Sequence, residues 1–195
     1  MPVRYRGYEF EIPPGVYTPR EDSLLLADHL EVPKGARVLD LGTGCGIQGI
    51  VASARAGGVV AADINPGAVR CAEENARLNG VENMTVVEGD LFDGIEGRFD
   101  LIAFNPPYLP TEPWEPKDVA SGAWDGGMDG REVVDRFLED VGDHLSGDGS
   151  LLLVQSSLNE LPRTIDALRE GSLSARIVAE RAFFFERLYL LEARP

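Results

Sequence analysis

The sequence predicts an α/β fold with a mostly parallel sheet, helices on both faces and a C-terminal antiparallel hairpin. Strand-like apolar runs alternate with helix-like segments along most of the chain, the pattern of parallel strands joined by helical crossovers. The last two strand-like runs follow each other with almost nothing between them, and this predicts the hairpin. The chain has 195 residues, enough for one substantial domain, so we expect a single domain over residues 1–195.

The strands are expected where apolar runs lie between turn signals. Those of the parallel part are Arg37–Leu41, Val59–Ala62, Met84–Glu88, Asp100–Phe104 and Ser150–Gln155. Those of the hairpin are Ala175–Phe185 and Arg187–Ala193.

Helices fill the gaps between the strands. Asn65 and Pro66 predict a helix start, a capping side chain followed by proline in the first turn, and Gly80 predicts its end. A second helix is expected from about Arg131 to Leu145, where apolar residues recur at helical spacing. Residues 108–130, which precede this second helix, are rich in Pro, Gly and acids, and a loop of that length is usually functional. We expect it to act as a lid over a substrate.

The charge balance is strongly acidic. The chain holds 33 Asp and Glu residues against 18 Lys and Arg, which gives a formal net charge of −15. Apart from Lys34 and Lys117, all the basic residues are arginines. Such a composition is typical of a halophilic protein, which stays soluble through its hydrated acidic surface. It argues against direct binding to nucleic acid, because a phosphate backbone is bound by clustered Lys and Arg.

The chain shows no targeting or membrane-spanning signal. Its first residues have no apolar core of signal-peptide length, and no stretch approaches the roughly 18 apolar residues of a membrane helix. Two cysteines and two histidines are too few for a disulfide framework or a structural zinc site. We therefore expect a cytoplasmic protein with reduced thiols and no metal.

A glycine-rich loop follows the first parallel strand and precedes a helical pattern. It reads Asp40-Leu-Gly-Thr-Gly-Cys-Gly46, in which Gly42 and Gly44 allow a tight turn and close approach of a ligand. Asp63 ends the next strand, 23 residues after Asp40, where an acid accepts hydrogen bonds from ribose hydroxyls. Loop and acid together predict a cofactor that contains adenosine.

The acid before the glycines distinguishes between such cofactors. Asp40 would repel the pyrophosphate of NAD but would attract the ammonium group of S-adenosylmethionine. Asp90 follows a later strand-like run and is placed to accept from the adenine amino group, with Leu91 packed near the ring. The pattern favours S-adenosylmethionine over NAD.

The motif Asn105-Pro106-Pro107-Tyr108 ends a buried strand. Its prolines stiffen the chain and donate no hydrogen bonds, so carbonyls remain free as acceptors. The Asn105 amide oxygen and the Pro106 carbonyl can then both accept from one planar NH2 group, on which Tyr108 can stack. Holding that group localises charge on a weakly nucleophilic nitrogen and aims it at a methyl carbon without a strong base.

Together these motifs resemble those of the HemK group of class I S-adenosylmethionine-dependent methyltransferases. Two further segments, residues 16–23 and 124–133, resemble its short archaeal and eukaryotic branch, so the resemblance covers nearly the whole chain. It implies a Rossmann-like methyltransferase sheet and methylation of the glutamine amide (N5) of a class 1 peptide-chain release factor. Bacterial HemK enzymes carry an N-terminal helical domain for which this chain has no room, so substrate recognition is expected to come from elsewhere.

The resemblance also implies roles for individual residues and a partner. A small zinc-binding activator is implied as the second subunit of a heterodimer. In the strand order of such a sheet, Met84–Val87 lies at an edge, where another chain can add a strand. Within an N-terminal segment (1–30), Tyr17, Pro19 and Glu21 cover the cofactor. The other implied residues are Asp40, Gly42, Asp63, Asp90 and Leu91 for the cofactor, and Asn105, Pro106 and Tyr108 for the substrate nitrogen.

Other functions remain open at this point. The same nitrogen chemistry suits the N6 amino group of adenine in DNA or RNA, but the net charge and the lack of a basic arm oppose it. A protein lysine is a third acceptor, and it would have to lose a proton first. A cofactor-binding scaffold without activity is opposed by the intact motif at Asn105–Tyr108, and an NAD oxidoreductase is opposed by Asp40.

Overall fold

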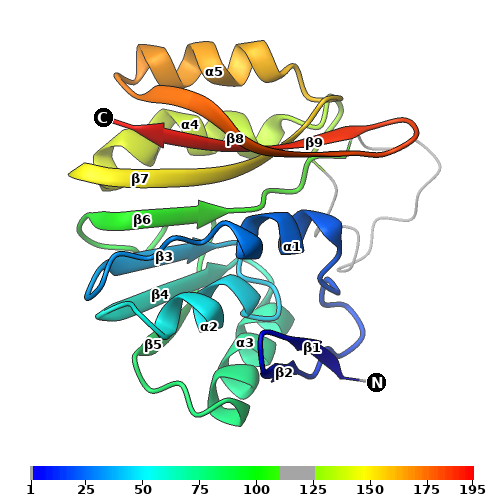
Figure 1. Ribbon diagram of the computed structural model, residues 1–195, viewed down its shortest axis with the longest axis vertical. Coiled ribbons are helices and arrows are strands. Elements are labelled where there is room, and N and C mark those ends of the chain that lie inside the picture. Colours follow the sequence, from blue (N-terminus) through cyan, green and yellow to red (C-terminus); the bar gives the residue numbers. More distant parts are fainter. Residues whose placement is uncertain (1, 110–125) are drawn as a thin grey trace.

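A computed structural model describes residues 2–109 and 126–195. A seven-stranded sheet forms its centre, in the spatial order β5-β4-β3-β6-β7-β9-β8 (Figure 1). The strands from β3 to β7 are mutually parallel, whereas β9 is antiparallel to β7 and to β8. The strand bounds are β1 Val3–Tyr5, β2 Tyr8–Phe10, β3 Arg37–Leu41, β4 Gly58–Asp63, β5 Met84–Glu88, β6 Phe99–Phe104, β7 Leu145–Ser156, β8 Ser174–Ala182 and β9 Arg187–Arg194.

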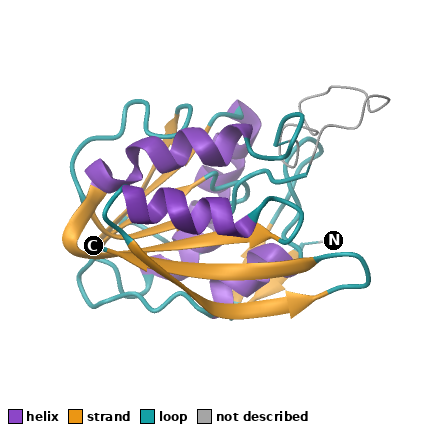
Figure 2. Cartoon of the chain, turned by 90° about the horizontal axis from the view of Figure 1, so that it is seen from above, coloured by secondary structure: helices purple, strands orange, loops and turns teal. Residues whose placement is uncertain are grey.

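Helices cover both faces of this sheet (Figure 2). They are α1 Glu21–Asp28, α2 Ile47–Ser53, α3 Pro66–Leu78, α4 Glu132–His144 and α5 Leu161–Glu170. Helix α3 starts as the sequence predicts, because the Asn65 side chain accepts from the Gly67 N–H at 2.8 Å and Pro66 occupies the first turn. None of the helices in the described ranges has the length and apolarity needed to cross a membrane.

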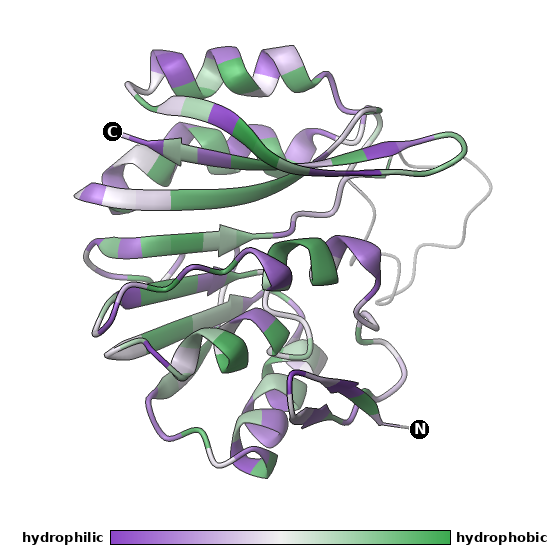
Figure 3. Ribbon diagram, viewed as in Figure 1, coloured by the Kyte–Doolittle hydropathy of each residue, from purple (hydrophilic) through white to green (hydrophobic). Residues whose placement is uncertain are grey.

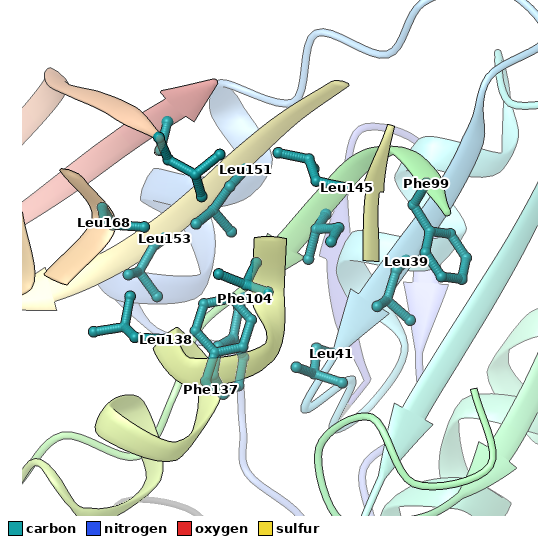
Figure 4. Close-up of a cluster of buried hydrophobic side chains, with 14 of the residues drawn as sticks. Leu39, Leu41, Phe99, Phe104, Phe137, Leu138, Leu145, Leu151, Leu153 and Leu168 are labelled. Carbon is teal, nitrogen blue, oxygen red and sulfur yellow. The ribbon is translucent and has the colours of Figure 1, made fainter. Parts of the chain in front are cut away.

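The core is split by the sheet into two layers, because side chains alternate along each strand. Leu39 and Leu41 of β3 pack in the cluster that contains Phe137 of α4 and Leu168 of α5 (Figure 4). Val38, which precedes Leu39 in the strand, packs with α1 on the opposite face. This two-sided burial explains why the sequence shows continuous apolar runs rather than alternation. Because β3 is parallel to β4 and to β6, the carboxyl ends of these three strands lie along the same side of the sheet.

Most of the predicted elements are present, with differences at their ends. β7 begins at Leu145, before the predicted Ser150, and runs directly on from α4. β8 ends at Ala182 rather than Phe185, because residues 183–186 form the turn of the hairpin. The edge position predicted for Met84–Val87 is confirmed, since β5 pairs with β4 and ends the sheet.

The N-terminal hairpin of β1 and β2 was not predicted. Its two-residue turn is Arg6-Gly7, both with positive φ, and a non-glycine residue in that conformation gives no sequence signal. Asn75 of α3 and Asn79, which follows the end of that helix, hold this segment against it through hydrogen bonds. Asn79 bonds the N–H and the C=O of Glu9, at 3.0 and 2.8 Å, and Asn75 accepts from the Glu11 N–H at 2.9 Å.

Candidate active site

Two cavities meet at the carboxyl ends of the parallel strands, where open α/β sheets bind their ligands. The first has a volume of about 330 Å³ and lies over the glycine loop. The second has a volume of about 480 Å³ and lies between the N-terminal segment, the loop after β6 and the β8–β9 hairpin. Asn105 and Tyr17 line both cavities, so they form the wall between them.

The glycine loop forms one side of the first cavity. Gly42, Gly44 and Gly46 all have positive φ, between 57° and 87°, a conformation that other residues rarely adopt. A Cβ on Gly42 would lie 3.3 Å from the Phe104 ring, whereas a Cβ on Gly44 would meet nothing within 4 Å. The backbone therefore turns tightly against the sheet at Gly42 and faces open space at Gly44.

Asp40 anchors this loop from beneath. Its Oδ2 accepts from the Thr43 hydroxyl at 2.6 Å and from the Gly49 N–H at 2.8 Å, which joins the strand, the loop and α2. The side chain lines the first cavity, and the residue is otherwise buried. Burial raises the pKa of Asp40 to about 7, although the hydrogen bonds from Thr43 and Gly49 oppose that shift.

Asp63 lies across the loop from Asp40, at the end of β4. Its Oδ2 accepts from the Gly44 N–H and its Oδ1 from the Asn65 N–H, each at 2.9 Å. Burial raises the pKa of Asp63 against the effect of these two bonds. Each oxygen retains a lone pair for a ligand hydroxyl in the first cavity.

Asp90 and Leu91 form the far end of the first cavity. Leu91 has a φ of 52°, a strained conformation for a branched side chain, and it packs on the core cluster below. Asp90 forms an ion pair with Arg136 of α4, with 2.6 Å between Oδ2 and Nη2. Arg136 was not anticipated from the sequence, although its place on the helix after the long loop brings it to the cavity.

A buried carboxylate organises the wall between the cavities. Asp22, at 4% exposure, accepts on Oδ2 from the Tyr17 hydroxyl at 2.9 Å, from Asn105 Nδ2 at 3.1 Å and from the Tyr108 hydroxyl at 3.3 Å. Its Oδ1 accepts from the N–H of Ser23 at 2.6 Å. Since the NH2 group of the Asn105 side chain donates to Asp22, the carbonyl oxygen of that amide points away from Asp22.

That carbonyl oxygen has no partner within residues 2–109 and 126–195. Oδ1 of Asn105 is buried and receives no hydrogen bond from any residue in the described ranges. An unsatisfied buried acceptor costs about 1–3 kcal/mol, so its presence at the junction of two cavities points to a donor supplied by a ligand.

The two tyrosines that bond to Asp22 remain protonated. Burial, and then the negative charge of Asp22, raise the pKa of both Tyr17 and Tyr108 well above the usual range. Both phenols therefore act as hydrogen-bond donors to Asp22. Neither can act as a general base near neutral pH.

The two ends of the long loop are tied together below the second cavity. Asn159 donates from Nδ2 to the carbonyl of Tyr108 at 2.6 Å and to that of Gly130 at 2.9 Å. Arg131, 1% exposed, bonds to Asp135 at 2.6 Å and Thr164 at 3.0 Å. The rest of the predicted lid, Trp114 and Trp124 included, lies outside the described residues.

The predicted site residues divide between the two cavities. Glu21, predicted beside the cofactor, lines the second cavity rather than the first. Asp22 was missed, although its signal, a second acid in the first turn of the predicted helix, was available. The first cavity is lined by Tyr17, Pro19, Asp40, Gly42, Gly44, Asp63, Asp90, Leu91, Asn105 and Pro107. Pro106 and Tyr108 line the second.

Comparison with known proteins gives concordant matches. The methyltransferase small domain family matches residues 7–119. A Methanocaldococcus jannaschii protein, provisionally named a protein N5-glutamine methyltransferase, is 40% identical over 99% of this chain and 98% of its own length. Human methyltransferase HEMK2 is 35% identical over 91% of this chain and 88% of its own length.

A solved structure agrees with these sequence matches. It is the Mtq2–Trm112 complex of E. cuniculi, responsible for methylation of the eRF1 translation termination factor. It superposes with a TM-score of 0.74 at 30% identity, over 92% of this chain and 98% of the matched one. The chain therefore belongs to the methyltransferase small domain family, within the HemK group of S-adenosylmethionine-dependent methyltransferases.

Proposed function

We propose that this enzyme methylates the side-chain amide nitrogen of a glutamine in a class 1 peptide-chain release factor. The observation that carries the proposal is the buried Oδ1 of Asn105 between the two cavities, which receives no hydrogen bond from the part of the chain that the structure describes. The names of two relatives support the substrate, since one is provisionally named a protein N5-glutamine methyltransferase and the other belongs to a complex responsible for methylation of a translation termination factor. Release factors act in the cytoplasm, and we place the reaction there.

The first cavity fits S-adenosylmethionine. Its volume of about 330 Å³ falls in the range of small-molecule sites, and Gly44 leaves open space where a Cβ would stand. Asp40 would hold the ammonium group through Oδ1, which takes no hydrogen bond from a described residue. Asp63 would hold the ribose hydroxyls, and Asp90 with Leu91 would hold the adenine. When bound there, the cofactor supplies an electrophilic methyl group on a sulfonium.

The second cavity fits the glutamine side chain. An amide nitrogen is a poor nucleophile because its lone pair is delocalised into the carbonyl group. Asn105 Oδ1 and the Pro106 carbonyl accept from its two N–H bonds, and Tyr108 covers one face of the planar group. Asp22 keeps the Asn105 amide from turning over, so the acceptor stays aimed at the nitrogen. These residues supply position and fixed dipoles rather than a base.

The methyl transfer balances in atoms and charge without a further reactant. A nitrogen–carbon bond forms as the sulfur–carbon bond breaks, the sulfonium charge is lost, and the methylated amide gives one proton to solvent. The products are N5-methylglutamine and S-adenosylhomocysteine.

The charges around the second cavity favour a protein amide over a nucleic acid. Glu21, Asp22 and Glu186 line it together with Arg20, so carboxylates outnumber the cation among the described lining residues. A polynucleotide would bring its phosphates to this surface on a chain of net charge −15. A neutral glutamine in an exposed protein loop meets no such repulsion.

We also propose that the enzyme works as a heterodimer with a small zinc-binding activator on the β5 edge. The relative solved as a complex with Trm112 supports a small partner. Val59 of β4 donates to the Asn83 carbonyl at 2.8 Å and stands opposite Met84. Since a strand in a parallel ladder bonds its neighbour through alternate residues, Thr85 and Val87 face β4. Met84 and Val86 then direct their backbone groups outward, open to another strand.

The acceptor is tested by transfer of labelled methyl from S-adenosylmethionine. Purified release factor and duplex DNA are offered in parallel at high salt, with and without the activator, and the product is located by mass. We expect label on a release-factor glutamine alone. Label on DNA, on a lysine or on neither substrate contradicts the proposed acceptor.

The partner is tested by one backbone substitution. Val86→Pro removes an outward N–H and leaves the β4 ladder intact, a position where sheets tolerate proline. Co-purification of a Trm112-type activator should then fall about tenfold or more, whereas Val86→Ala, which keeps the N–H, retains it. Undiminished binding by Val86→Pro places the activator elsewhere.

A further inference from the structure

The turn of the β8–β9 hairpin exposes a group of aromatic side chains. Phe183, Phe184 and Phe185 are consecutive, and their exposed fractions are 41%, 92% and 86%. The rings of Phe184 and Phe185 pack edge to face, with centroids 4.5 Å apart. The turn shows as an apolar tip that extends beyond the rest of the sheet (Figure 3). Large apolar side chains gathered in this way mark a surface that binds another molecule.

The hairpin is built to hold this tip in one position. The N–H of Phe183 donates to the Glu186 carbonyl at 2.7 Å and closes the turn. At its base, the Ser157 N–H donates to the Arg187 carbonyl at 2.8 Å, and the Arg187 N–H donates to the Ser157 hydroxyl at 3.0 Å. β9 continues from there as an interior strand paired with β7. The aromatic tip is therefore anchored to the core of the enzyme.

The same turn reaches the second cavity. Phe183, Glu186 and Leu188 line it together with the residues that surround Asn105. Oε1 of Glu186 is buried and accepts no hydrogen bond from any residue that the structure describes. Among the described residues that line this cavity, Glu186 thus carries a second unsatisfied acceptor besides Asn105. The negative charge of Glu186 also contributes to the raised pKa of Tyr108, which places the two groups near each other.

We propose that the Phe183–Glu186 turn is the docking site for the protein segment that flanks the methyl-accepting glutamine. Phe184 and Phe185 pack on an apolar side chain of that segment, and Glu186 Oε1 accepts from one of its backbone N–H groups. The proposal deepens the proposed function and rests on it. It assigns recognition of the substrate chain to the hairpin, in a protein whose first cavity holds only the cofactor.

Position and charge select this occupant over others. The activator is placed on β5, which ends the sheet at the edge opposite to β8. A second copy of the chain would bring another charge of −15 to the same surface. A peptide segment suits both features of the site, because it offers a neutral N–H donor and an apolar side chain within the reach of one turn. The cavity then leads from this turn to Asn105.

The test compares four variants with the wild-type enzyme in complex with its activator. Phe184→Ser with Phe185→Ser removes the apolar tip. Glu186→Ala removes the acceptor, and Glu186→Gln keeps an acceptor oxygen without the charge. Ile177→Ser is the matched control, since Ile177 is a 45% exposed apolar residue of the same hairpin, far along β8 from the tip. The readouts are KM and kcat for purified release factor and the Kd for S-adenosylmethionine.

We expect the KM for release factor to rise about tenfold in the double variant and in Glu186→Ala, with kcat changed less than about twofold. Glu186→Gln should raise the KM only about threefold, because a neutral acceptor still bonds an N–H. The control and the cofactor Kd should stay at wild-type values. Since the Glu186 carboxylate makes no hydrogen bond or ion pair with a residue of the described ranges, Glu186→Ala reports on docking even if the double variant folds poorly.

The outcomes separate this proposal from the proposed function. Methylation of release factor by the wild-type enzyme, with unchanged KM in the double variant and in Glu186→Ala, overturns the docking site alone. No methylation of release factor by the wild-type enzyme overturns both. A changed oligomeric state of the double variant with unchanged KM assigns the tip to contact between copies of the chain and also overturns the proposal.

Discussion

The two cavities on either side of Asn105 are built in different ways. In the first, the carboxylates of Asp40 and Asp63 are already bonded to the glycine loop before any ligand arrives. In the second, the acceptor oxygens of Asn105 and Glu186 are buried without donors from the described chain. One side is assembled by its own hydrogen bonds, and the other leaves bonds to be completed by a ligand.

This difference indicates a division of labour. Preformed geometry suits a cofactor that every reaction cycle uses, because little must be ordered when it binds. Unsatisfied acceptors suit a transient substrate, because only a ligand that brings donors compensates for their cost. Substitutions in the two cavities should therefore change different kinetic constants, and the predictions below depend on that separation.

The largest effect is expected at the wall. Asn105→Ala removes the acceptor for the substrate nitrogen, and we expect kcat to fall about 10²- to 10³-fold while the Kd for S-adenosylmethionine changes less than about threefold. Turnover assays and calorimetry measure the two constants. Asn83→Ala truncates a half-buried asparagine outside both cavities and should leave both unchanged. Parallel loss of binding and turnover in Asn105→Ala would assign the residue to the cofactor side.

The reverse pattern is expected in the first cavity. Asp63→Ala removes the proposed ribose contact and the partner of the Gly44 N–H, so the Kd for S-adenosylmethionine should rise about 30-fold. At saturating cofactor the kcat should stay within about threefold of wild type. Asp63→Asn keeps one acceptor oxygen, so its Kd for S-adenosylmethionine should lie between those of the wild-type enzyme and Asp63→Ala. A lost kcat with an unchanged Kd contradicts the assignment of Asp63.

Cofactor affinity should depend on pH through Asp40. Burial raises the pKa of Asp40 in the free enzyme to about 7, so the carboxyl is mostly protonated at pH 6. An ammonium group binds the ionised form, so binding must release a proton. The affinity should therefore rise about tenfold per pH unit below pH 7 and level off above it.

Calorimetry in buffers of different ionisation enthalpy counts the protons released on cofactor binding. Asp40→Asn cannot ionise at this position, so its cofactor affinity should be weaker and independent of pH over the same range. An affinity that does not vary between pH 6 and 8 in the wild-type enzyme would mean that Asp40 only supports the loop.

The smallest effect is expected from the phenol of Tyr108. Tyr108→Phe removes a 3.3 Å bond to Asp22, which still receives Tyr17 and the Asn105 amide, and keeps the ring that covers the substrate. We expect kcat to fall no more than about threefold, whereas Tyr108→Ala should lose tenfold or more in kcat/KM. Steady-state kinetics on release factor measures both. An equal loss in the two variants would mean that the hydroxyl, not the ring, contributes.

The elements that the sequence predicts well are those with local signals. The parallel strands, the cap at Asn65 and the edge position of β5 follow from apolar runs, turn residues and strand order. The first cavity is also local, because its loop and its acids stand at the ends of successive strands. The prediction used the glycine loop after Asp40, the spacing from Asp40 to Asp63 and the place of Asp90 after a later strand.

The motif Asn105–Tyr108 predicted one part of the second cavity, but its other residues could not be predicted in the same way. Asp22 meets Asn105 across 83 residues of chain, and Glu186 joins them from the C-terminal hairpin. The spacing of apolar residues along the sequence predicts local helices and strands, and it does not predict contacts between residues so far apart. The pairing of Arg136 with Asp90 spans 46 residues of chain, and the turn at Arg6-Gly7 depends on a conformation that the residue type does not reveal.

The most direct test of the two-cavity account is a crystal structure with both ligands bound. The complex would hold S-adenosylhomocysteine and a release-factor peptide that contains the glutamine. We predict the cofactor product in the first cavity and the glutamine side chain in the second, its amide nitrogen within hydrogen-bond distance of Asn105 Oδ1 and the Pro106 carbonyl. A glutamine bound away from Asn105, or one that approaches it from the first cavity, would contradict the account.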